Sequence, residues 1–137
     1  MKVFVDANVL VSVLNREYPL FSSAARILSL ADRPHFQIYT SPICLAIAFY
    51  FAEKKSGTAR AKEKISFLLD KLMITVTNQE TVSLTAANRA INDFEDGLEY
   101  YSAVKAGCKM IVTEDTGDFF FSSIPVMDCE AFINTLR

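Results

Sequence analysis

The chain begins with a short apolar run that ends in an acid, residues 2–6 with the sequence KVFVD. β-Branched and aromatic residues of this kind favour a buried strand, which would leave Asp6 at its carboxyl end. A second apolar run, 110–113, is followed by Asp115 and Asp118. In open α/β sheets, sites for chemistry lie outside the carboxyl ends of the strands. The pattern therefore predicts a fold that carries several acids to one edge of a sheet.

Strand and helix patterns alternate along the rest of the chain. Beyond the first strand, strands are expected at about 35–40, 73–76, 109–113 and 125–127, and helices at about 7–14, 21–31, 42–56, 58–72, 78–92, 96–106 and 128–136. Ser41 followed by Pro42 is a typical helix start, and Thr58 is a further expected cap. Residues 77–80, with the sequence TNQE, form a capping-box pattern, and Gly57 and Gly107 are natural helix ends. Strands that alternate with helices predict a mainly parallel sheet covered on both faces, a three-layer α/β/α sandwich.

Length and composition limit the class of protein. The 137 residues, 51% of them hydrophobic, are enough for one domain, which we expect to span 1–137. No apolar stretch reaches the ~18–20 residues of a membrane span, and the N-terminus lacks the pattern of a secretion signal. The three cysteines, at 44, 108 and 129, have no disulfide or metal spacing. We therefore expect a soluble cytoplasmic protein with free thiols and no membrane partner.

The middle of the chain holds four acids within seven residues: Asp93, Glu95, Asp96 and Glu99. Like charges at helical spacing repel by a few tenths of a kcal/mol per pair, and a bound cation would reverse that penalty. Taken alone, Asp6 is better explained as a helix cap, and Asp96 can also be interpreted as a cap. The loop acids after the late strand are equally well explained as turn residues. The joint pattern favours a pocket of carboxylates for a divalent metal ion.

Three groups of residues, in this order and on this layout of strands and helices, match a known family: Val5-Asp6-Ala7-Asn8-Val9-Leu10, then Asp96 with Tyr100, Ala103 and Gly107, then Ile111-Val112-Thr113 with Asp115 and Asp118-Phe119. Over essentially its whole length the chain resembles a PIN domain, the nuclease fold of VapC-type toxins in bacterial toxin–antitoxin pairs. The resemblance implies a flavodoxin-like sandwich that binds Mg²⁺ or Mn²⁺ and cleaves RNA. It also implies a small antitoxin as partner and a homodimer.

Carried over by position, the resemblance implies that Asp6, Asp96 and Asp118 are the catalytic metal ligands, with Asp115 close by as a further ligand. Asn8 and Thr113 would be polar supports. The chain departs from the family where a glutamate is usual on the helix after the second strand, because that position holds Ile47. Two outcomes stay open: Asp93, Glu95 or Glu99 supplies the missing charge, or the metal is held weakly and catalysis is impaired.

Metal-assisted hydrolysis needs no nucleophilic side chain, because a metal can activate water and polarise the phosphoryl group. This suits a chain whose one histidine, His35, stands in a polar turn remote from every acid cluster. Five basic residues lie within eleven positions: Lys54, Lys55, Arg60, Lys62 and Lys64. They are either a solvated helix–turn–helix edge, which we slightly favour, or an RNA contact made by Lys54, Lys55 and Arg60 that offsets the net charge of −2.

Two aromatic triplets, 49–51 and 119–121, cannot lie wholly on one face of a helix or strand, and Phe120 and Phe121 are the candidates for a partner contact. Rival classes fit less well. A response-regulator receiver would need paired acids after the first strand, and a haloacid-dehalogenase-type phosphatase would need Asp-x-Asp where this chain has Asp6-Ala7-Asn8. A catalytically impaired PIN-fold module that binds RNA or protein remains the alternative, because of Ile47.

Overall fold

The computed structural model describes residues 1–137 and is built on one five-stranded sheet. The strands are β1 (Lys2–Val5), β2 (Gln37–Thr40), β3 (Met73–Ile74), β4 (Met110–Val112) and β5 (Val126–Met127). They run in the order β3-β2-β1-β4-β5, and every neighbouring pair is parallel. β1 is the central strand, with Phe4 opposite Tyr39 on one side and Ile111 on the other. The expected parallel sheet is therefore confirmed.

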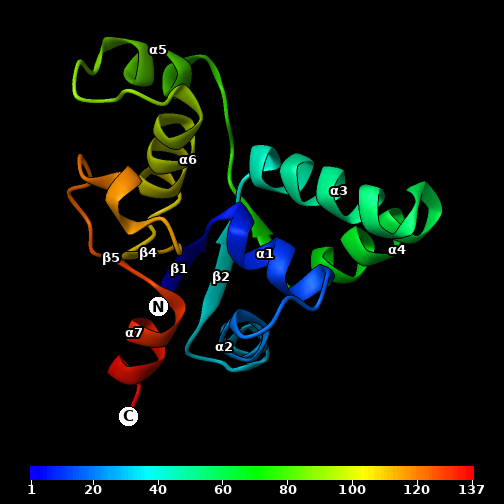
Figure 1. Ribbon diagram of the computed structural model, residues 1–137. Helices are drawn as coiled ribbons and strands as arrows, with labels where there is room; N and C mark the ends of the chain where they lie inside the picture. Colours follow the sequence, from blue (N-terminus) through cyan, green and yellow to red (C-terminus); the bar gives the residue numbers. More distant parts are fainter.

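Seven helices surround this sheet: α1 (Ala7–Leu14), α2 (Leu20–Ser29), α3 (Pro42–Ser56), α4 (Thr58–Leu69), α5 (Gln79–Ala87), α6 (Phe94–Lys105) and α7 (Cys129–Thr135). Two short 3₁₀ segments, η1 (Leu30–Asp32) and η2 (Thr116–Phe119), complete the element order. Figure 1 shows α6 on one side of the sheet and α1 and α2 on the other. The chain moves from β1 to β2 in one direction and from β3 to β4 in the opposite direction, so right-handed crossovers place their helices on opposite faces. The α/β/α layers are thus as the sequence predicts, and none of the helices is both long and apolar enough to span a bilayer.

Caps set where the helices near the sheet edge begin. Ser41 Oγ accepts a hydrogen bond from the backbone N–H of Cys44 at 3.1 Å, and Pro42 follows it in the first turn, as expected. α6 begins two residues earlier than expected, because Asp93 rather than Asp96 is its N-cap and accepts from the backbone N–H of Glu95 at 3.0 Å. This frees Asp96 from capping.

Three further boundaries differ from the sequence predictions. Gly57, at φ 84°, precedes α4, so Thr58 lies inside the helix and its hydroxyl donates to Glu53 instead. The capping box of α5 lies one residue later than expected, because Asn78 rather than Thr77 is the cap and Thr81 rather than Glu80 closes the box. α5 ends at Ala87, before the expected 92, because the Asn88 side chain accepts from the backbone N–H of Ala90 and forms a turn.

The apolar core fixes α6 against the sheet and α5. Val3, Phe4 and Val5 of β1 are fully buried within a cluster of 29 buried hydrophobic residues. Gly97 of α6 lies so close to α5 that a Cβ there would meet Thr85 Cγ2 at 2.4 Å. This close packing holds the first turns of α6, and therefore the acids on either side of Gly97, in one position.

Candidate metal centre at the carboxyl edge of the sheet

Asp6 lies at the junction of β1 and α1 with both carboxylate oxygens held. Oδ1 accepts from the backbone N–H of Ala7 at 2.7 Å, and Oδ2 accepts from the hydroxyl of Thr113 at 2.8 Å. The side chain is buried, and its backbone N–H donates to Val112 O at 3.0 Å, which ties the residue to the end of β4. Asp6 is therefore a helix cap and also a fixed carboxylate at the sheet edge, so the two interpretations of its sequence position do not exclude each other.

A short polar network supports Asp6 from the side of β4. Asn8 Nδ2 lies 3.1 Å from Thr113 Oγ1 and 3.2 Å from Asp115 Oδ2, and it donates to both. Thr113 in turn accepts from the backbone N–H of Asp115 at 3.1 Å. These hydrogen bonds connect Asn8, Thr113 and Asp115 to one another beside Asp6.

Two acids of α6 face Asp6 from across this edge. Asp96 and Glu99 stand three residues apart, on one face of the helix, and are only 8% and 0% exposed. Carboxylate oxygens of Asp96, Glu99 and the exposed Glu95 lie within 4.8 Å of one another. Glu99 also belongs to a second group, with Asp6 and Cys44, whose ligand atoms likewise lie within 4.8 Å of one another. Glu99 is therefore the residue that joins the acids of α6 to the acid of β1.

The pocket is strongly biased toward cations. Burial, followed by the nearby Asp6 carboxylate, raises the pKa of Glu99 to about 11. Burial and then the charges of Asp93, Asp6 and Asp118 raise the pKa of Asp96 to about 7. One oxygen of Glu99, Oε2, is buried without any hydrogen-bond partner. Buried carboxylates that repel one another and have no partner are stabilised by a bound cation.

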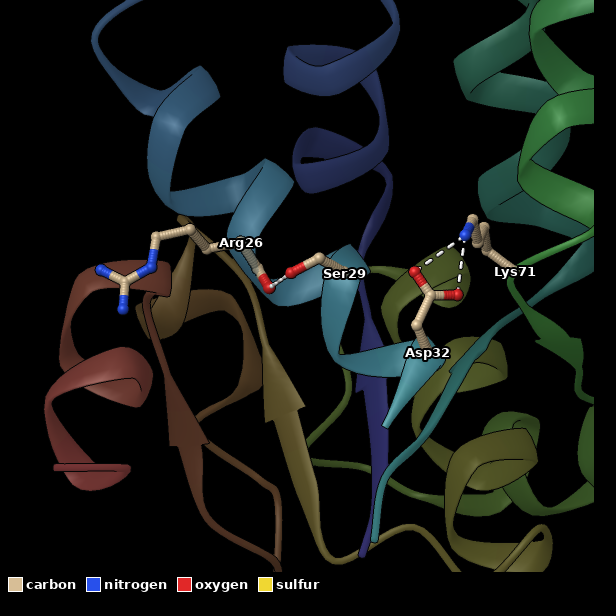
Figure 2. A network of polar contacts seen from close by, with 4 residues as sticks. All are labelled: Arg26, Ser29, Asp32 and Lys71. Atoms are coloured by element: carbon tan, nitrogen blue, oxygen red, sulfur yellow. Dashed lines mark hydrogen bonds and ion pairs between the residues drawn. The ribbon is translucent and has the colours of Figure 1, made fainter. Parts of the chain in front are cut away.

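No side-chain cation of the chain neutralises these acids. The two ion pairs lie elsewhere: Lys105 pairs with Glu80, and Lys71 Nζ donates to both oxygens of Asp32 at 2.7 and 2.9 Å. Figure 2 shows the Lys71–Asp32 pair beside η1, near a separate contact in which the Ser29 hydroxyl donates to the carbonyl of Arg26. The charge of the pocket is thus left for a ligand.

The remaining acids proposed from the sequence lie at the margin. Asp118, in η2, is exposed, yet it is close enough for its charge to raise the pKa of Asp96. Asp115 is exposed and held by Asn8. Asp93 is the cap of α6. The structure therefore links Asp6 and Asp96 through Glu99, whereas Asp118 and Asp115 are exposed and lie outside the clustered ligand atoms.

Sequence reasoning missed Cys44. The thiol is fully buried, its Sγ lies 3.0 Å from Glu99 Oε1 and 3.8 Å from Asp6 Oδ1, and it donates toward both. Burial, then the charges of Glu99 and Asp6, raise its pKa. The signal was present, because a helix capped at Ser41 places its third residue, Cys44, in the first turn above the sheet edge. Ile47, one turn farther along, is half-buried and packs against the apolar core.

The basic residues near Gly57 are only partly gathered. Lys55, Arg60, Lys64 and Arg16 line a surface cavity of about 550 Å³. Burial and then the charges of the other three lower the pKa of Lys64. Lys54 lies apart, with its Nζ 4.8 Å from the centre of the Tyr50 ring. The structure thus forms a positive cavity from two of the three expected contact residues, with Arg16 and Lys64 added.

The second aromatic triplet divides between core and surface. Phe119 is buried, Phe121 packs edge-on against Tyr100 at 5.2 Å between ring centres, and Phe120 is 63% exposed. Phe121 is half-buried, so Phe120 is the member with a free face.

Comparison with known proteins points in one direction. A family model described as a PIN domain matches residues 2–117. Ribonuclease VapC1 of Aquifex aeolicus (strain VF5) is 31% identical over 139 residues, which cover 96% of this chain and 92% of the relative.

Two solved structures share the fold. VapBC2 of Rickettsia felis, bound to a DNA fragment from its promoter, gives a TM-score of 0.70 at 18% identity over 93% of this chain and 98% of the other. VapC20 of Mycobacterium tuberculosis, a toxin that cleaves the sarcin–ricin loop, gives 0.62 at 15% identity over 80% and 86%.

Proposed function

The chain belongs to the PIN domain family, and from this premise we propose that it is a metal-dependent endoribonuclease and the toxin of a type II toxin–antitoxin pair. The relative named Ribonuclease VapC1 supports RNA as the substrate. The VapBC2 complex supports a small antitoxin as the partner. A toxin that acts on RNA and is held by such a partner works in the cytoplasm.

The observation that carries this proposal is the meeting of Asp6, Asp96 and Glu99 with no positive side chain among them. The unpartnered Oε2 of Glu99 is the structural sign of a ligand position. An all-oxygen set with a few carboxylates suits a hard divalent ion such as Mg²⁺ or Mn²⁺. The residues present therefore fit the metal that the family implies.

Glu99 is our proposed substitute for the carboxylate that Ile47 leaves missing from α3. Its support is that a Glu99 oxygen lies within 4.8 Å of Asp6 in one group of ligand atoms and within 4.8 Å of Asp96 in another. We therefore favour an active nuclease over the catalytically impaired binding module. On this proposal the half-buried Ile47 serves only in packing, and the carboxylate that the family usually carries at its position is supplied by α6 instead.

In this mechanism Asp6, Asp96 and Glu99 would hold Mg²⁺ or Mn²⁺, and Asp118 and Asp115 would lie where RNA enters. When bound, the metal lowers the pKa of water and polarises the phosphoryl oxygen. Thr113 and the N-terminus of α1 fix the direction of the Asp6 oxygens. Without metal, burial and the neighbouring carboxylates raise the pKa of Asp96 to about 7, so the metal and a proton would compete for this carboxylate near neutral pH. Lys55 and Arg60 would attract the RNA backbone.

The test is cleavage of RNA by the purified chain with Mg²⁺ or Mn²⁺, with and without EDTA. We expect EDTA to stop cleavage, and Asp6→Asn, Asp96→Asn and Glu99→Gln to abolish it while the fold is retained. Asp70→Asn, an exposed acid at the end of α4, is the matched control and should cleave normally. Full activity in all three pocket variants would refute the site. A folded parent that binds Mn²⁺ without cutting RNA would favour the binding module.

A further inference from the structure

Building on the proposed function, we propose that the same pocket binds a thiophilic divalent ion of the zinc type through Cys44 Sγ, Asp6 and Glu99. Such an ion would exclude Mg²⁺. The three ligand atoms come from three elements, β1, α3 and α6, that the sheet edge brings together. All three side chains are buried, with 7%, 0% and 0% exposure for Asp6, Cys44 and Glu99.

The distances suit a tetrahedral ion. Zinc lies about 2.3 Å from sulfur and about 2.0–2.2 Å from oxygen, so a tetrahedral angle places S and O ligands roughly 3.5 Å apart. Cys44 Sγ is 3.0 Å from Glu99 Oε1 and 3.8 Å from Asp6 Oδ1, which brackets that value. The Asp6 and Glu99 oxygens lie within 4.8 Å of each other. Small side-chain shifts would therefore complete three of four positions, with water or a phosphate oxygen in the fourth.

Two independent features point to a ligand here. Glu99 Oε2 is fully buried and has no partner in the protein. Cys44 Sγ is also fully buried, and it lies 3.0 Å from Glu99 Oε1 and 3.8 Å from Asp6 Oδ1, with no basic side chain paired to either acid. Binding would form one metal–sulfur bond and two metal–oxygen bonds, and it would release to water both the thiol proton and the proton that Glu99 holds in the metal-free protein. The ion would then replace the repulsion between Asp6 and Glu99 by attraction to both.

The thiol is what separates zinc from magnesium. Mg²⁺ takes oxygen ligands in octahedral geometry, so Cys44 offers it nothing. Thiolate ligands select softer ions such as Zn²⁺. Because Asp6 and Glu99 would serve both ions, the pocket can hold one at a time. Zinc should consequently inhibit the Mg²⁺-supported reaction, and Cys44 should set the strength of that inhibition.

The experiment uses Co²⁺ as a coloured probe on the full chain, freed of metal and kept reduced. The parent should show thiolate-to-cobalt charge-transfer absorption in the near ultraviolet and tetrahedral bands in the visible, and Zn²⁺ should displace both. Cys44→Ser should lose the charge-transfer absorption and weaken Zn²⁺ affinity by at least about tenfold, the lower end of what even outer-shell partners of a metal contribute.

Cys108→Ser is the matched control, because Cys108 is also a buried free thiol but belongs to neither acid cluster. It should keep the charge-transfer absorption. Absence of that absorption in the parent, or its survival in Cys44→Ser, would overturn the proposal. A circular dichroism melt checks folding, and Cys44→Ala serves if the serine variant does not fold. The spectrum needs no RNA, so a failure of the nuclease proposal would appear separately, as absence of cleavage beside intact cobalt binding.

Discussion

Glu99→Gln tests the electrostatics of the pocket most directly. The change keeps the size of the side chain and an oxygen that can accept from the Cys44 thiol, and removes only the ionisable group. In metal-free protein Glu99 has a pKa of about 11, against an ordinary value of 4.5. The folded chain therefore keeps a proton at neutral pH that the unfolded chain releases.

The direction and size of the expected stability change follow from this difference in pKa. A raised pKa gives stability that is complete below pH 4.5 and is lost as the pH rises toward 11. Each pH unit is worth roughly 1.4 kcal/mol. From pH 4.5 to 7 the metal-free parent should therefore lose about 3 kcal/mol of unfolding free energy that the glutamine variant keeps. At pH 4.5 the two proteins should be close in stability.

The assay is urea unfolding in EDTA at several pH values between 4.5 and 8, followed by Mn²⁺ titration calorimetry at neutral pH. We expect Glu99→Gln to be the more stable protein at pH 7 and to bind Mn²⁺ poorly. The control Glu63→Gln changes an exposed glutamate of α4, and it should alter neither the stability at pH 7 nor the affinity for Mn²⁺. If the stability difference between the glutamine variant and the parent is the same at pH 4.5 and at pH 7, Glu99 is not held protonated in the folded protein, and a strongly raised pKa at this position is refuted.

Three further predictions concern residues outside the acid cluster. Ile47→Glu should lower the unfolding free energy by about 1–3 kcal/mol and leave Mn²⁺ affinity unchanged, because Ile47 packs on the core and Glu99 already supplies the charge. A thermal melt and titration calorimetry measure the two quantities, and tighter Mn²⁺ binding would contradict the prediction. The double variant Lys55→Glu, Arg60→Glu should weaken RNA binding and reduce the slope of log affinity against log salt concentration by roughly 1.4, the value for two lost phosphate contacts on a single strand. Filter binding at several salt concentrations measures this slope, and an unchanged slope would mean that these residues are solvated and do not contact RNA. Phe120→Ser should weaken homodimerisation or antitoxin capture with little change in melting temperature, as followed by light scattering and pull-down; association equal to that of the parent in both assays would exclude this surface.

The sequence by itself determined the layout of the fold, because the signals for it are local. Apolar runs of strand length, helical spacing, and caps such as Ser41 and Gly107 depend on neighbours a few residues away. Alternation of strands and helices then leaves a parallel sheet as the arrangement that buries both faces. Asp6 could be placed at the sheet edge for the same reason, since a strand ends where its apolar run ends.

Which acids meet was decided only by the tertiary structure. Asp93, Glu95, Asp96 and Glu99 look alike in the sequence, and the choice of Asp93 as the cap of α6 turns Asp96 and Glu99 inward. The approach of Cys44 to Glu99 joins residues 55 positions apart, and no local pattern encodes that contact. It arises because the carboxyl end of β1 and the first turns of α3 and α6 lie at one edge, where packing around Phe4 and the tight fit at Gly97 fix their positions. Burial at that edge is also what gives these ordinary side chains their unusual charge states.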